Sequence, residues 1–74
     1  MKNTLLTNFG LLVKNAREKK CMNQEQLGYA VDMHKNYIGM IERGERNISF
    51  CKAISLIQYL DLDISVLYDK SNKD

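Results

Sequence analysis

The segment between Asn23 and Gly44 constrains the fold most, because it contains two helical patterns separated by only about three residues. Asn23 and Gln26 have the spacing of a capping box, which predicts a helix that begins near Gln24. Gly28 lies inside this helix, where a missing side chain lets a second helix cross closely. The apolar residues of its inner face are expected to be Leu27, Ala30 and Val31.

The second helix of this segment has its apolar residues on one side only. That side is formed by Met33, Tyr37, Ile38 and Ile41, which recur at the helical period of about 3.6 residues. The residues outside this stripe are His34, Lys35, Asn36, Gly39 and Met40. A helix with a buried back and a polar front is a shape that the major groove of DNA accepts.

The sequence of 74 residues predicts a single all-α domain. A chain of this length buries only a small core and gains stability from self-association. Five helices with short links are expected, with the approximate bounds Thr4–Lys20, Gln24–Val31, His34–Arg43, Phe50–Leu60 and Ile64–Tyr68. The predicted architecture is therefore a compact five-helix globule.

The helix ends and the remaining apolar faces support these bounds. Ser49 and Asp63 are natural N-caps for the last two helices, and Gly44 suits a left-handed C-cap. The first helix is expected to bury Phe9, Val13 and Ala16, and the fourth to bury Ala53, Ile54, Ile57 and Leu60.

Composition excludes several classes of protein. The sequence contains no apolar run of the roughly 18 residues that would span a bilayer. Its first segment, Met-Lys-Asn-Thr-Leu-Leu, is too short and too polar for a secretory signal. We therefore expect a cytoplasmic protein with no membrane partner. Cys21 and Cys51 lack the spacing of a metal site and are expected to be free thiols.

Enzymatic function finds no support in the sequence. It contains no glycine-rich phosphate loop, no histidine partner for either cysteine and no paired acidic motif. We expect no enzyme activity, no metal and no cofactor.

The formal net charge of +2 is small, but its distribution is uneven. Residues 1–60 hold nine Lys or Arg against five Asp or Glu, whereas residues 61–74 hold two against four. The basic excess accompanies the two-helix segment, where contact with DNA phosphates would need it.

Several motifs together resemble the phage-repressor-like (Xre-type) family of helix-turn-helix DNA-binding regulators. The resemblance covers about residues 9–68, which leaves an acidic tail at residues 69–74 that we expect to be flexible. It rests on Gln24-Glu25-x-Leu27, Gly28, Tyr37-Ile38, Ile41-Glu42-Arg43-Gly44 and Ser49. The chain departs from the family pattern at three loop positions, which are Cys21, Asp32 and Ile48.

A second motif in the chain resembles one subgroup of this family. The run Glu42-Arg43-x-x-Arg46-Asn47-Ile48-Ser49 resembles the controller proteins of restriction–modification systems, which are small dimeric regulators. Other short Xre-type regulators share most of these residues, so both assignments stay open.

The resemblance and the helix pattern together assign roles to individual residues. Bases in the major groove are expected to be read by Lys35, Asn36 and Met40. The DNA backbone is expected to be contacted by Gln24, His34, Tyr37, Arg43, Arg46 and Asn47. The resemblance further implies an ion pair between Arg17 and Glu42 that ties the first helix to the third.

Apolar residues near the C-terminal end predict self-association. Leu62 and Leu67 are expected to close the core, which leaves Ile64, Val66 and Tyr68 as candidates for a homodimer interface. The expected function is sequence-specific binding of a palindromic operator by a homodimer. Whether this regulator represses or activates depends on the position of its operator, and no small-molecule effector is expected. The alternative is a protein-interaction or antitoxin-like module with the same fold.

Overall fold

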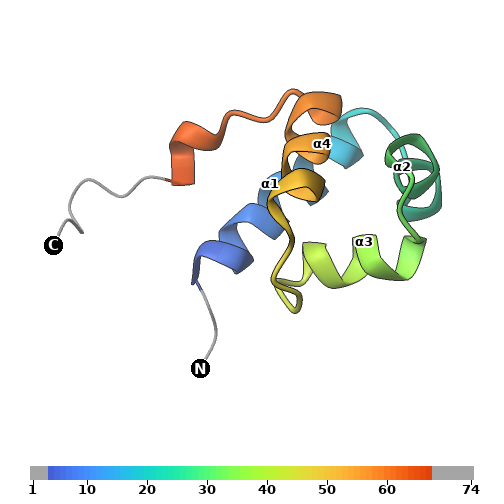
Figure 1. Cartoon of the computed structure of the whole chain (residues 1–74). Helices are drawn as coiled ribbons and strands as arrows, with labels where there is room; N and C mark the ends of the chain where they lie inside the picture. Colours follow the sequence, from blue (N-terminus) through green and yellow to red (C-terminus); the bar gives the residue numbers. More distant parts are fainter. Residues whose placement is uncertain (1–3, 68–74) are drawn as a thin grey trace, which may run out of the picture.

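The computed structural model describes residues 4–67, and every regular element within them is helical. The elements are α1 (Thr4–Lys19), α2 (Gln24–Val31), α3 (Lys35–Glu42), α4 (Phe50–Leu60) and the 3-10 helix η1 (Ile64–Leu67). Helices α2 and α3 pack against each other, and α1 contacts α3, α4 and η1 (Figure 1). No helix in this part of the chain has the length and apolar character to cross a membrane.

The all-α class is confirmed, but the prediction of five α-helices is wrong. The segment expected to form the fifth helix is a single 3-10 turn in residues 64–67, and Tyr68 lies outside the described residues. Asp63 Oδ1 accepts hydrogen bonds from Ser65 N at 3.1 Å and Ser65 Oγ at 2.6 Å. These bonds lower the pKa of Asp63. The first of these bonds satisfies a backbone amide of the turn locally, and short turns of this kind are commonly 3-10 rather than α-helical.

Side-chain caps define where the two helices of the helix-turn-helix, α2 and α3, begin. Asn23 and Gln26 form the predicted capping box, with Asn23 Oδ1 accepting from Gln26 N at 2.7 Å and Gln26 Oε1 accepting from Asn23 N at 2.8 Å. His34 caps α3, because its Nδ1 accepts from Asn36 N at 3.0 Å. The prediction that α3 spans His34 to Arg43 was one residue too long at each end, since these two residues are its caps.

All four α-helices end in the same way. The residues Cys21, Asp32, Gly44 and Asp61 have a left-handed backbone, with φ of 58°, 59°, 72° and 56°. The amide that follows each of them donates to the carbonyl five residues earlier, the main bond of a Schellman motif. Gly44 was expected at such a position, whereas Cys21 adopts this conformation without the freedom of glycine.

The core lies where α1, α2, α3 and α4 meet. Its buried members are Phe9, Val13, Leu27, Ile38, Ile41, Leu56 and Leu60. Ala16, Ala53, Ile57, Leu62 and Leu67 are partly buried against it. Two predictions were wrong: Ala30 is exposed, and Leu56 is fully buried although Ile54 was expected in its place. The buried stripe of α4 consists of residues 53, 56, 57 and 60. The predicted stripe, with Ile54 in place of Leu56, is equally apolar in the sequence.

Two glycines allow the backbone segments around α3 to approach closely. A Cβ at Gly10 would collide with the carbonyl oxygens of Ile41 and Glu42, so the close approach of α1 to the end of α3 requires glycine at this position. A Cβ at Gly28 would collide with the carbonyl oxygen of Met33. Because Gly28 has no side chain, the bend at Met33 can fold back against α2. Gly28 therefore accommodates the backbone of the bend, whereas the sequence predicted the crossing of a second helix there.

Candidate nucleic-acid interface

The first turn of α3 presents polar side chains to solvent. Lys35 and Asn36 are its first two residues and are exposed, as is the capping residue His34. The opposite side of α3 is buried through Ile38 and Ile41. The helix is therefore fixed by its back, and the side chains predicted to read bases are free to reach a ligand.

A buried polar network holds α3 from behind. Arg17 Nε donates to Glu42 Oε2 at 2.6 Å, and Arg17 Nη2 donates to Glu42 Oε1 at 3.1 Å. Arg17 Nη1 also donates to the Met22 carbonyl at 2.7 Å. Arg17 is 8% exposed and Glu42 is 7% exposed. The bond to Glu42 raises the pKa of Arg17, and the pair joins α1 to α3 at two points.

Gln24 joins this network from the start of α2. Its Nε2 donates to Glu42 Oε1 at 3.0 Å. A carboxylate only accepts hydrogen bonds, which fixes the orientation of the amide. Its Oε1 lies 3.4 Å from the place that a Cβ would occupy on Gly39. Gly39 was expected on the outer side of α3 but is buried beneath this side chain.

The end of α3 carries an exposed ion pair. Arg43 Nε donates to Glu45 Oε2 at 2.9 Å, and this bond raises the pKa of Arg43. Arg43 was predicted to contact the DNA backbone, and a phosphate would have to compete with this carboxylate. Asn47 lies exposed further along the same loop.

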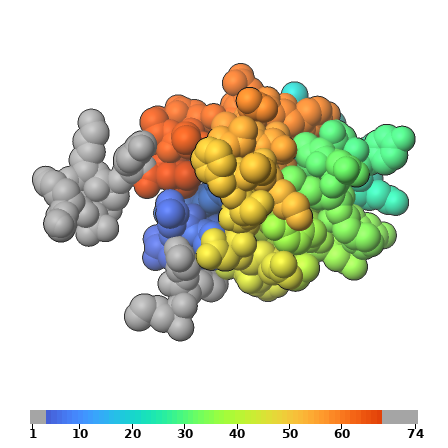
Figure 2. All heavy atoms as spheres, in the orientation of Figure 1, coloured from blue at the N-terminus to red at the C-terminus, as the bar shows by residue number. Residues whose placement is uncertain are grey.

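Tyr37 is half-buried, and two cations lie close to its ring. The guanidinium of Arg46 is 5.3 Å from the centroid of its ring, and Lys52 Nζ is 4.8 Å from the same centroid. Lys52, in the first turn of α4, was not among the predicted site residues. The sequence carried no signal for it, because its approach to Tyr37 depends on the path of the loop at residues 43–49. Figure 2 shows that α3, this loop and the start of α4 form one continuous face.

The remaining predicted residues lie at the margins of this face or away from it. Met40 is half-buried, so it is less available for base contact than Lys35 and Asn36. Ile64 is 40% exposed and Val66 is 61% exposed, on the separate surface of η1. Tyr68, the third predicted interface residue, lies outside the described residues.

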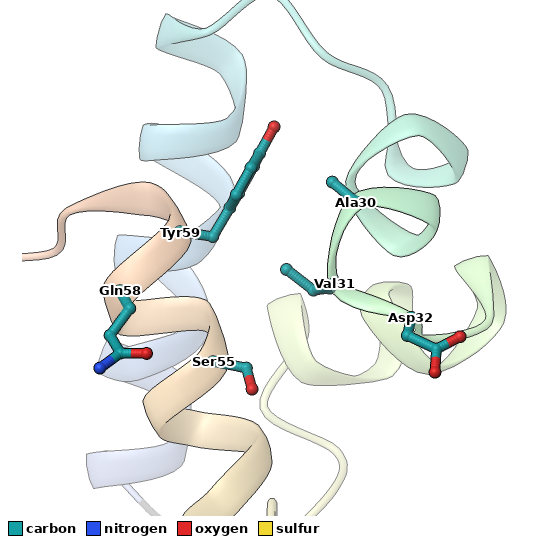
Figure 3. Close-up of a pocket in the computed structure, with 6 residues that line it drawn as sticks. All are labelled: Ala30, Val31, Asp32, Ser55, Gln58 and Tyr59. Carbon is teal, nitrogen blue, oxygen red and sulfur yellow. The ribbon is translucent and has the colours of Figure 1, made fainter.

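A surface hollow between the end of α2 and α4 contains none of the predicted site residues. Its lining comes from Ala30, Val31, Asp32, Ser55, Gln58 and Tyr59 (Figure 3). Ala30, Val31 and Asp32 come from the end of α2 and its C-cap, and the other three residues come from α4 on the opposite side. The hollow therefore lends no support to the roles predicted for the site residues.

Comparison with known proteins identifies the family. Residues 13–67 match the family model described as helix-turn-helix. Control protein C.SmaI of Serratia marcescens is 35% identical over 60 residues, which cover 77% of this chain and 71% of that protein. The chain belongs to the helix-turn-helix family of restriction–modification controller proteins. The resemblance found in the sequence is thereby confirmed.

A second relative is more similar over a shorter region. Control protein C.BamHI of Bacillus amyloliquefaciens is 44% identical over 50 residues, or 66% of this chain. The matched region spans 62% of the length of that relative.

Solved structures of controller proteins have the same fold. The restriction–modification controller protein C.AhdI from Aeromonas hydrophila is 30% identical, with a TM-score of 0.77 over 89% of this chain and 100% of that chain. The controller protein C.Esp1396I, solved as a tetramer in complex with its natural 35 base-pair operator, is 29% identical. Its TM-score is 0.76 over 89% of this chain and 87% of that chain.

Proposed function

We propose that this protein is a transcriptional regulator that binds a DNA operator through α3. The observation that carries the proposal is the two-sided character of α3. Its back is held by the Arg17–Glu42 pair and the core, while Lys35 and Asn36 extend from its exposed first turn. Rigid placement of a few polar side chains is what recognition of base edges requires.

We assign base reading to the N-terminal part of α3. A lysine donates to guanine O6 or N7, and an asparagine bridges adenine N6 and N7. Met40 would have an accessory role against a thymine methyl group, since it is half-buried. These contacts would give the sequence preference of the protein.

We assign phosphate contacts to residues around this helix. Gln24 begins α2, where free backbone amides and the helix dipole favour an anion. The other proposed phosphate contacts are His34, Tyr37, Arg43, Arg46 and Asn47. They would set affinity and register more than sequence preference, because phosphates are common to all duplexes.

We propose that two copies bind together through the surface of η1. Val66 and Ile64 leave apolar area exposed there, and a second copy would cover it. A two-fold dimer would place its recognition helices about 34–36 Å apart, in successive major grooves of a palindromic operator. The related protein C.Esp1396I forms a tetramer on its operator, which supports binding by more than one copy.

The experiment that tests the function is the selection of bound duplexes from a random pool. A palindromic motif is expected, with half-sites separated by about one helical turn. Recovery of no enriched sequence, together with no salt-dependent binding of duplex, would contradict the proposal. A protein-interaction module would give that result.

The assigned base readers can be tested one at a time. Lys35→Ala and Asn36→Ala should each weaken binding to the selected duplex by about 1–3 kcal/mol and relax preference at one position. Because both side chains are exposed, the free energy of unfolding should change by less than about 0.5 kcal/mol. Equal losses on selected and random duplexes, measured by fluorescence anisotropy, would reassign these residues to the backbone.

A further inference from the structure

The aromatic ring of Tyr37 brings together two cations from other parts of the chain. Arg46 belongs to the loop after α3, and Lys52 belongs to the first turn of α4. Their distances to the ring centroid, 5.3 Å and 4.8 Å, are inside the range of about 6 Å for cation–π attraction. One half-buried ring on the recognition helix therefore holds both side chains beside it.

This grouping of like charges is suited to an anion. Two cations on one ring repel each other, and the negative face of the ring offsets only part of that repulsion. An anion placed beside both would be attracted by each. Arg17 pairs with Glu42 and Arg43 pairs with Glu45, whereas Arg46 and Lys52 lie beside the ring.

The position of the cluster identifies the anion. The ring belongs to α3, one residue after Asn36. Helix α3, the loop after it and the start of α4 form one continuous face (Figure 2). A duplex that receives α3 in its major groove presents the phosphates of the groove edge to this face. The matching ligand is therefore the phosphate backbone of DNA.

We propose that Lys52 contacts the DNA backbone and that the ring of Tyr37 positions Lys52 and Arg46 for this contact. The inference rests on the proposed function, because it names a further residue of the same interface. It also separates two roles of Tyr37. The ring orders two charged side chains, whereas the hydroxyl supplies one neutral hydrogen bond.

The first test is the salt dependence of binding to a random-sequence duplex. Each phosphate that a cation neutralises contributes about 0.9 to the slope of log affinity against log salt concentration. Lys52→Gln should make this slope shallower by about one unit. The variant should weaken binding to selected and random duplexes by the same factor, because a backbone contact carries no base preference.

The second test separates the ring from the hydroxyl. Tyr37→Phe keeps the ring, so the slope should stay at the parent value. Tyr37→Leu removes the ring, so the slope should become shallower. In the Tyr37→Leu background, Lys52→Gln should then cost less affinity than it does in the parent. Should Tyr37→Leu fail to fold, Tyr37→Met makes the same comparison with a flexible side chain.

A matched control exists at the other end of α4. Lys20 Nζ lies 5.6 Å from the ring centroid of Tyr59, so this pair has the same chemistry away from α3. Lys20→Gln should leave the slope unchanged. An unchanged slope for Lys52→Gln, or strictly additive losses for Tyr37→Leu and Lys52→Gln, would overturn this inference. A parent protein without salt-dependent duplex binding would instead overturn the proposed function.

Discussion

At the residue scale, the end of α1 depends on an unfavourable backbone conformation. Cys21 has a φ of 58°, in a left-handed region that costs an L-residue roughly 1–2 kcal/mol. The Schellman motif at the end of α1 still forms, because the amide of Cys21 donates to the carbonyl of Glu18 and the amide of Met22 donates to the carbonyl of Arg17. These bonds lead the chain into the start of α2.

Glycine at this position should stabilise the protein. We expect Cys21→Gly to raise the free energy of unfolding by up to about 1 kcal/mol, because relief of strain exceeds the extra entropy of an unfolded glycine. Each kcal/mol corresponds to about 4–8 °C in the melting temperature of a domain of this size. Calorimetry measures the change. Cys21→Ala keeps the Cβ and should give no comparable gain; equal gains in both variants would mean that the thiol is responsible.

At the element scale, the Arg17–Glu42 pair sets how α1 meets α3. Both residues are buried, and Glu42 also accepts from Gln24 on α2. A buried ion pair adds little net stability, but loss of one partner leaves an uncompensated charge. The three helices are therefore connected through one carboxylate beside the Gly10 crossing.

Double-mutant analysis should reveal this coupling. Arg17→Met and Glu42→Met should each destabilise the fold by about 3–5 kcal/mol, whereas the double variant should lose clearly less than the sum. Urea unfolding supplies the four free energies. Glu18→Met is the control, because Glu18 is exposed and its carboxylate approaches Arg17 no closer than 4.0 Å. This variant should lower the free energy of unfolding by less than about 1 kcal/mol. Additive losses for Arg17 and Glu42 would show that they act independently.

At the scale of the whole molecule, the proposed dimer would use the apolar surface of η1. A single recognition helix contacts few bases, so useful specificity depends on a second copy. Val66, at 61% exposed, is the most accessible of the described apolar side chains on η1. Its burial by a partner would link the two copies.

A charge at this position should separate the copies. We expect Val66→Glu to give a folded monomer that binds a palindromic duplex far more weakly than the parent, because a buried unpaired carboxylate opposes association. Sedimentation measures the mass, and circular dichroism checks the fold. Tyr29→Glu is the matched control, because Tyr29 is 92% exposed on α2. A dimeric mass for Val66→Glu would place the interface elsewhere.

Much of the local structure followed from the sequence. The capping box at Asn23, the cap at Ser49 and the apolar back of α3 depend on residues a few positions apart, so spacing alone predicted them. The family motifs predicted the helix-turn-helix, and the resemblance implied that Arg17 and Glu42 pair. In each case the determining interaction is local or is repeated across a family.

Only the tertiary structure decided the rest. It selected Leu56 over Ile54 as a core residue, because two apolar stripes overlap on α4 and packing against α1 and α2 chooses between them. It also buried Gly39 beneath Gln24 and brought Lys52 to Tyr37. These contacts join segments that lie far apart in the sequence. Side-chain spacing carries no information about such approaches, since they depend on how the loops place one helix against another.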